Sequence, residues 1–290
     1  MARLQPGAIY GEAHHGWKGR EPVNNKTTND PEKSALIELI YQLGDDDFIL
    51  AYRGSEWLGL APHIEEDVAF SSISQDMMGH ATMYYHLLEA LGEGEADELA
   101  HLRNPEAFRN AILLEKVNGS GTYLDKPDYD WAFAVVRNYF YAVHKQVRLE
   151  SLRLSSYGPL ADAARKIITE QYYHLMHWEL WFKQLVTSTE EAKKRMFSAV
   201  ETVWKDFGGV LTLGPSYSEM VKAGFIEDEN LMKKRWLNRI EKMFQETGVP
   251  LQGEPLIESG NGRKREHTQD LADALATLSE VYATNPASGW

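Results

Sequence analysis

Hydrophobic side chains recur at alternating steps of four and three residues along three long stretches of this chain. The stripes run through residues 31–60, 64–92 and 160–187. This spacing places apolar residues on one face of an α-helix, so each stretch predicts a long helix packed against its neighbours. Their members are Leu36, Ile40, Leu43, Asp47, Leu50, Gly54 and Trp57, then Ile73, Met77, His80, Tyr84, Leu87 and Leu91, and finally Leu160, Ala164, Ile167, Gln171, His174, Trp178, Trp181 and Leu185.

A fourth stretch, residues 128–155, is apolar but less cleanly phased, and we expect a fourth helix there. Pro31, Pro62, Pro127 and Pro159 predict helix starts, because proline fits the first helical turn and is expelled from helix interiors. Period-two alternation is too short to build a large sheet. Only Val117–Tyr123, with its Asn118-Gly119 turn signal, favours a hairpin.

The predicted fold is all-α, a four-helix bundle with additional C-terminal helices. It forms a single domain over residues 31–290, after an irregular polar extension of residues 1–30. Shorter helical patterns predict the additional helices at 190–206, 229–246 and 266–284, with a loop over 248–263.

Composition excludes several classes of function. The 290 residues include 30 Lys and Arg against 43 Asp and Glu, a net charge of −13. This acid excess argues against nucleic-acid binding, which needs a clustered positive field. Zero cysteines exclude disulfides, thiolate nucleophiles and iron–sulfur clusters. Without an apolar signal sequence or a membrane-spanning run, we expect a cytoplasmic protein with no membrane partner.

Polar residues interrupt each clean stripe in the middle of its apolar face. Asp47 does so in the first helix, His80 in the second, and Gln171 with His174 in the fourth. Asp76 and Glu170 precede the two histidines by four residues, one helical turn. Burying such groups without partners costs several kcal/mol, so we expect them to converge and pair.

Inward carboxylates and histidines in a four-helix bundle are the frame of di-iron carboxylate proteins. There, two helices each give one Glu and two give a Glu-x-x-His pair. Here Met77 and Gln171 stand where the two motif glutamates belong, and the slot on the third helix falls near Ala142. Only Asp47 remains to balance two ferrous ions, which leaves about three positive charges uncompensated. We therefore expect no di-iron centre and no metal in this chain.

Three interpretations of the polar residues stay open at this point. The favoured one is a buried hydrogen-bonded cluster of Asp76, Glu170, His80 and His174. The second is a mononuclear metal site of Asp47, His80 and His174, a two-His-one-carboxylate set. In the third, the histidines do not converge, or a different site exists. Of the neighbouring acids, we expect Asp45 and Asp46 to face solvent.

Several blocks carry a resemblance to a known family. They include Leu43–Arg53, Ser55–Pro62 with the sequence Ser-Glu-Trp-Leu-Gly-Leu-Ala-Pro, Glu65–Ala69, Phe108–Asn110, Leu113–Glu115, Asn118-Gly119, Tyr172–His174 and His267–Leu271. Over roughly residues 35–290 the chain resembles the C subunits of the bacterial phenylacetyl-CoA epoxidases, the ring-oxygenating complexes of phenylacetate degradation.

The resemblance implies a ferritin-like fold and a structural role. In that family the A subunit holds the di-iron centre and binds phenylacetyl-CoA, while the C subunit is a paralogue that has lost most ligands. Non-glutamate residues at 77 and 171 agree with a C subunit, whereas retention of both His80 and His174 departs from the pattern. The implied partner is the paralogous catalytic subunit, and we expect a homodimer or larger assembly when the chain is isolated.

Three functions follow as hypotheses. The leading one is a non-catalytic structural subunit of the epoxidase with no cofactor of its own. The second is a metal-dependent oxygenase or oxidase that uses Asp47, His80 and His174. The third is iron handling in the ferritin manner, which also needs the missing carboxylates.

Other features have ordinary explanations. Trp178, Trp181, Tyr172 and Tyr173 could shape an aromatic pocket, but at helical spacing core and interface positions are more common. The basic run Lys193–Arg195 could meet a CoA phosphate, but such a run is usually a solvated helix face. Gly260–Arg265, a turn with a basic cluster, could contact a partner or a phosphate.

Overall fold

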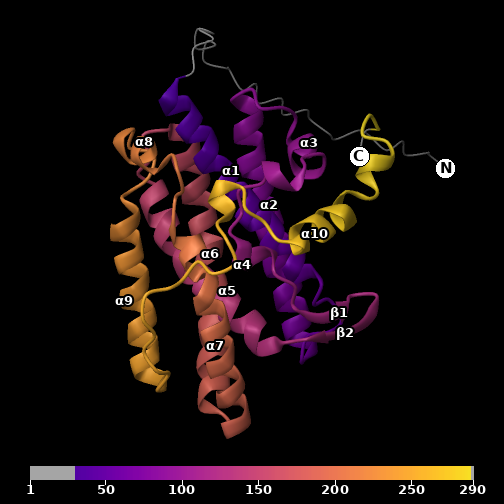
Figure 1. Ribbon diagram of the computed structural model, residues 1–290, viewed down its shortest axis with the longest axis vertical. Helices are drawn as coiled ribbons and strands as arrows, with labels where there is room; N and C mark the ends of the chain where they lie inside the picture. The colour runs from indigo at the N-terminus through magenta and orange to yellow at the C-terminus, as the bar shows by residue number, and fades with distance from the viewer. Residues whose placement is uncertain (1–29, 289–290) are drawn as a thin grey trace, which may run out of the picture.

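The computed structural model describes residues 30–288, and helices dominate this part of the chain (Figure 1). The all-α prediction is confirmed. The predicted extension, residues 1–30, lies outside the described residues except for Asp30. In order, the elements are α1 (Pro31–Ser55), α2 (Ile64–Ala90), α3 (Ala96–His101), α4 (Ile112–Glu115), β1 (Gly119–Thr122), β2 (Asp125–Tyr129), α5 (Trp131–Leu152), α6 (Gly158–Thr187), α7 (Glu190–Leu211), α8 (Tyr217–Lys222), α9 (Glu229–Thr247) and α10 (Gln269–Ser279), with short 3₁₀ turns at Pro105–Ala107, Gly262–Lys264 and Tyr282–Thr284.

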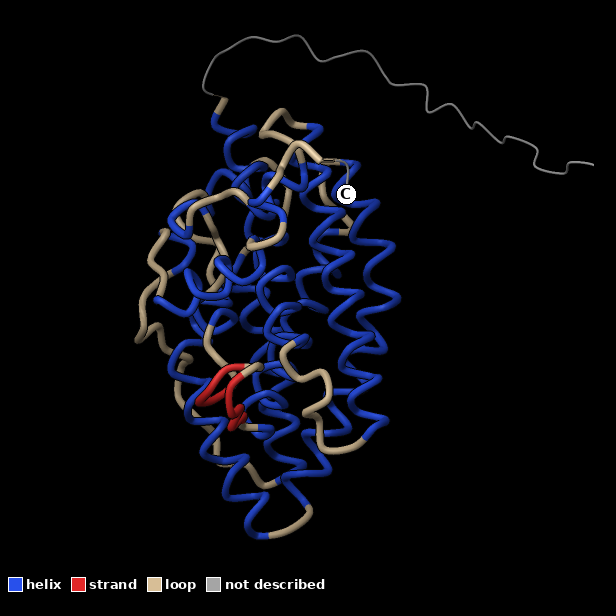
Figure 2. The backbone as a smooth tube through the Cα atoms, turned by 90° about the vertical axis from the view of Figure 1, so that its right-hand side faces the viewer, coloured by secondary structure: helices blue, strands red, loops and turns tan. Residues whose placement is uncertain are grey.

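The four long helices predicted from the sequence are α1, α2, α5 and α6. They run along the long axis of the molecule (Figures 1 and 2). α1 packs along α2, α5 packs along α6, and α2 also meets α6. α5 further contacts α7 and α9, so 19 of its 22 residues are buried. A helix covered on all sides has no polar face, which explains why the stripe over 128–155 is poorly phased.

Of the four prolines predicted to start helices, two lie in a first helical turn, one lies just before a helix, and one lies in a strand. Pro31 and Pro159 lie in the first turns of α1 and α6. Pro62 lies just before the N-cap of α2. Pro127 instead lies inside β2, and α5 begins four residues later behind Asp130, whose side chain accepts a hydrogen bond from the Phe133 N–H. The prediction of a helix start at Pro127 is therefore wrong, because Asp130 supplies the cap.

The predicted hairpin exists, but its turn is not Asn118-Gly119. β1 and β2 pair antiparallel from Gly119 opposite Tyr129 to Thr122 opposite Asp125, so the chain reverses at residues 123–124. Gly119 is required for a different reason, since a Cβ there would lie 2.2 Å from the Asp128 carbonyl oxygen. Asn118 is buried, and its amide donates to the Arg53 carbonyl.

The C-terminal prediction needs one further correction. The expected helix over 266–284 is shorter, because α10 covers Gln269–Ser279 and only a 3₁₀ turn follows at Tyr282–Thr284. The short helices α3, α4 and α8 were not predicted, since a single turn is too short to show periodicity. Across residues 30–288, no helix has both the length and the apolar character that a membrane crossing requires.

Asp45 and Asp46 are fully buried, so the expectation that they face solvent is wrong. The Arg263 guanidinium binds both oxygens of Asp46 at 2.8 Å, and Arg148 Nη1 donates to Oδ2 at 2.8 Å. Tyr85 donates its hydroxyl to Asp45, with Arg103 beside it. The loop after α3 covers Asp45, while α5 and the C-terminal segment cover Asp46. Burial alone would raise the pKa of Asp46, but Arg263 and Arg148 hold it below its ordinary value.

We predict that Arg263→Met lowers the free energy of unfolding by about 3–5 kcal/mol, because removing one partner leaves a buried charge under-compensated. Arg165→Met is the matched control. Arg165 pairs with Asp162 at the surface, where an ion pair contributes less than about 1 kcal/mol. Urea denaturation of both variants tests this. Equal losses in the two variants would contradict the structural role of Arg263.

Candidate functional site: a buried lysine between a carboxylate and an imidazole

Polar side chains from all four long helices meet in the interior, as the interrupted stripes predicted. α1 contributes Asp47, α2 His80, α5 Tyr141 and Lys145, and α6 His174, all of them buried. The rings of His80 and His174 lie 6.1 Å apart between centroids. His80 Nδ1 lies 4.0 Å from Asp47 Oδ2. The predicted remnant-site residues therefore share one region of the core.

Lys145 occupies the space between the carboxylate and the imidazole. Its Nζ lies 2.7 Å from Asp47 Oδ2 and 2.9 Å from His80 Nδ1. Tyr141 donates its hydroxyl to the other oxygen of Asp47 at 2.9 Å. The ammonium group thus contacts the two side chains that would bind a cation, and it carries the positive charge that a metal would bring.

The contacts of His80 define its tautomer. Because Lys145 donates to Nδ1, the proton of the neutral ring lies on Nε2, which donates to Glu170 Oε2 at 2.7 Å. Burial lowers the pKa of His80, and the nearby positive charge of Lys145 lowers it further. His80 is therefore a neutral imidazole with both nitrogens engaged.

His174 of α6 contacts an acid of α2, just as His80 of α2 contacts an acid of α6. His174 Nε2 lies 3.0 Å from Asp76 Oδ2, while its buried Nδ1 has no partner among the described residues. Burial lowers the pKa of His174, although Asp76 acts against this shift. Asp76 and Glu170 each lie one turn from a histidine on their own helix, yet each pairs with the histidine of the opposite helix. The cluster therefore ties α2 to α6.

Burial and ion pairing act in opposite directions on the central pair. Burial raises the pKa of Asp47, while Lys145 lowers it. Burial likewise lowers the pKa of Lys145, while Asp47 raises it. Burial has the larger effect on both groups, so the pKa of Asp47 lies above its ordinary value and the pKa of Lys145 below its own. Removal of either group would leave its partner buried with an unsatisfied polar atom.

The donor set does not fit a di-iron centre. Gln171, in a glutamate slot, donates its amide to the Ala142 carbonyl at 2.9 Å, and Met77 packs in the core. The cavity lined by Asp47, Tyr141 and Lys145 measures about 10 Å³, the space of a single water molecule. Among residues 30–288, no three His, Asp or Glu side chains are grouped to hold a metal ion.

The arrangement also does not fit a mononuclear metal site of Asp47, His80 and His174, because the ligand atoms of the first two are already engaged. Both oxygens of Asp47 and both nitrogens of His80 already have partners, and the central position holds a cation. A divalent ion there would be repelled by the Lys145 ammonium group in the low-dielectric interior.

Lys145 was not identified from the sequence as a residue of this centre. The available signal was a lysine three residues after the Ala142 slot, on the same side of the predicted helix.

The aromatic and basic residues singled out in the sequence divide into buried and exposed ones. Trp178 and Trp181 are core residues, whereas Tyr172 and Tyr173 are each 60% exposed. In the basic cluster at 260–265, Arg263 is buried against Asp46. It is therefore not available to a phosphate.

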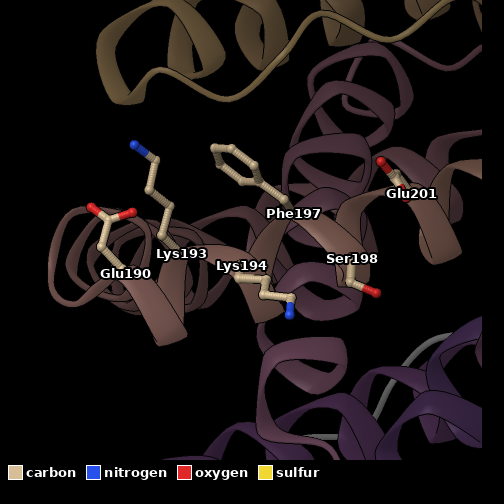
Figure 3. A pocket seen from close by; sticks show the side chains of 6 residues that line it. All are labelled: Glu190, Lys193, Lys194, Phe197, Ser198 and Glu201. Atoms are coloured by element: carbon tan, nitrogen blue, oxygen red, sulfur yellow. The ribbon is translucent and has the colours of Figure 1, made fainter.

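The basic run on α7 borders a surface cavity of about 390 Å³ (Figure 3). Lys193 and Lys194 point to different sides of the helix in this view. Glu190 and Glu201 also line the cavity, and Arg195 pairs with Glu191. Mixed charge at an open surface is typical of a solvated helix face.

An all-α fold whose buried carboxylate and imidazole are joined by a lysine defines the class of this protein. The chain belongs to the phenylacetic acid catabolic protein family, whose model matches residues 21–290. It is 26% identical over 256 residues to the C subunit of 1,2-phenylacetyl-CoA epoxidase from Escherichia coli (strain K12). The alignment covers 88% of this chain and 99% of the relative. The resemblance inferred from the sequence is confirmed.

The buried histidines predict a loss of stability in mild acid. Burial lowers the pKa of His144, whose two ring nitrogens lack partners among the described residues. Below the ordinary histidine pKa, about 6.5, the unfolded chain binds a proton that the folded chain refuses, so stability falls as pH falls.

Between pH 7.5 and 5.5 each such histidine costs about 1.4 kcal/mol of unfolding free energy. We predict that His144→Phe loses less stability than wild type over this range, by about that amount for one proton. Urea titrations at the two pH values measure the difference. Identical losses would mean that His144 is protonated inside the fold.

The position of Lys145 predicts how a metal site could be restored. Met77→Glu, Ala142→Glu and Gln171→Glu rebuild the carboxylate template but keep the ammonium group, so we expect no rise in melting temperature with ferrous iron. Adding Lys145→Met should produce a rise, because a ligand that binds only the folded state stabilises it. Lys145→Met alone is the control and should not respond. Iron stabilisation of the variant that retains Lys145 would contradict this account.

Proposed function

We propose that this chain is a non-catalytic structural subunit of a multicomponent monooxygenase that epoxidises the ring of phenylacetyl-CoA. In this proposal the chain pairs with a paralogous catalytic subunit, which holds the di-iron centre. The observation that carries the proposal is Lys145, whose contacts with Asp47 and His80 take up the groups that would bind a metal.

The relation to a known epoxidase component supports the same role. The E. coli relative is named as the C subunit of 1,2-phenylacetyl-CoA epoxidase, and it matches this chain over nearly its whole length. A paralogous pair needs only one oxygen-activating centre. The other member can then contribute a surface that supports the catalytic subunit, with its own centre closed by protein groups.

An independent oxygenase activity has no comparable support. It would require Lys145 to leave a buried ion pair and His80 to give up its contact with Lys145. Truncating one partner of a buried pair costs about 3–5 kcal/mol. Binding of a metal would have to exceed that cost before any chemistry began. The same reasoning applies to ferritin-like iron handling.

We predict that the protein purified without added iron contains far less than one iron ion per chain, and that loading with ferrous iron does not change this. Co-expression with the di-iron catalytic subunit should give a stable complex, and ring epoxidation should require both. Metal analysis and a reconstituted assay with phenylacetyl-CoA, O₂ and reducing equivalents measure these outcomes. Stoichiometric iron, or oxygenase activity of the chain alone, would overturn the proposal.

A further inference from the structure

The outer side of α6 presents apolar side chains to solvent, and partly exposed acids lie on α6 and on the neighbouring α2. On α6, Tyr173, Met176 and Leu180 are 60%, 53% and 63% exposed. Tyr172 adds a ring that packs edge-on against Tyr173. Residues 173, 176 and 180 follow the three- and four-residue steps of one helical side. We call this surface, with Asp76 and Glu170, the α2–α6 face.

The two acids of the α2–α6 face are held in fixed positions. The side chains of Asp76 and Glu170 are 43% and 54% exposed, and each accepts a hydrogen bond from a buried imidazole, His174 and His80 respectively. A carboxylate has about four lone-pair sites, so both retain acceptor capacity toward solvent. Lys166, one turn before Glu170, makes no ion pair with it in the described structure.

The buried polar centre supports this arrangement from behind. Hydrogen bonds run without a break from Asp47 through Lys145 and His80 to Glu170. Lys145 fixes the tautomer of His80, and that tautomer presents the N–H that orients Glu170. The former metal position thus acts on the surface, since its hydrogen bonds position an exposed carboxylate.

The charge of the α2–α6 face favours a different protein over a second copy of this chain as its binding partner. A two-fold contact between two copies of this chain would set the same patch against itself, with Asp76 and Glu170 facing a second chain of net charge −13. A complementary partner instead brings cations to fixed acids within apolar surroundings, and Arg binds carboxylates bidentately. Apolar anchors around a few oriented polar groups are typical of binding hot spots.

We propose that the α2–α6 face is the surface on which the catalytic subunit docks, through a segment that places Arg or Lys between apolar side chains. The inference rests on the proposed function, because that function supplies the partner. His80 is a positioning residue for this contact, since it acts through Glu170.

Affinity for the catalytic subunit tests the face directly. Leu180→Asp and Met176→Asp should weaken binding at least tenfold, because each places an unpaired acid in a desolvated interface. Leu231→Asp is the matched control, since Leu231 is 53% exposed and lies on α9, not among the residues that define this face. It should bind within twofold of wild type. Thermal melting checks that all three variants fold.

Glu170 and His80 test the polar part of the face. Glu170→Gln should weaken docking several-fold by removing the charge. His80→Phe should do the same by releasing Glu170, whereas His80→Gln should restore part of the affinity because its amide can donate to Glu170. A structural role of His80 alone would lower stability in both His80 variants without separating their affinities, and would overturn its positioning role.

The absence of cysteine permits a second measurement. Leu180→Cys and Leu231→Cys give single labelling sites, and complex formation should protect only the first from maleimide. Equal labelling of both in the complex, or tight docking of Leu180→Asp, would overturn the proposal and leave the proposed function intact. If self-association protects Leu180→Cys, a second copy is the occupant and the proposal fails. If wild type does not bind the catalytic subunit at all, the proposed function fails with it.

Discussion

The compensation of buried negative charge on α1 is the constraint on which the rest of the structure depends. Three consecutive aspartates, Asp45 to Asp47, are buried and pair with different neighbours. Arg103 meets the first, Arg148 and Arg263 the second, and Lys145 the third. These cations come from α5, the loop after α3 and the C-terminal segment. The ion pairs therefore specify how three distant parts of the chain close around one helix.

Much of the fold could be predicted because the long helices have distinct polar and apolar faces. Apolar stripes indicated α1, α2 and α6, and the polar interruptions at Asp47, His80 and His174 correctly located the centre. The fourth helix was harder to phase because α5 is buried all round, which removes the contrast that periodicity needs. The turn predicted at Asn118-Gly119 was wrong because these residues have other roles. Gly119 allows a close approach of the two strands, and Asn118 donates a hydrogen bond to the end of α1.

The chemistry of the centre was less accessible to sequence reasoning. Counting carboxylates showed that a di-iron site was incomplete, but the count does not reveal what neutralises Asp47. Lys145 lies in the poorly phased stretch over 128–155, where periodicity does not indicate which side chains face the centre. Asp45 and Asp46 looked like a solvated acid run because their cations lie far away in sequence, and Arg263 is 217 residues from Asp46. Long-range charge pairing leaves no periodic trace.

A buried lysine stabilises a helical bundle differently from a bound metal. A metal contributes only when bound, so stability depends on its concentration and on deprotonated ligands. A lysine is part of the chain and cannot dissociate, and its ammonium group has three hydrogen-bond donors. In this chain those donors fix the imidazole tautomer and, through it, a carboxylate at the surface. Asp47 and His80 both serve as acceptors for Lys145, so their burial needs no metal. Buried histidines in such a bundle are thus no sign of a metal by themselves. The informative residue is the one that contacts both the carboxylate and the imidazole, here Lys145.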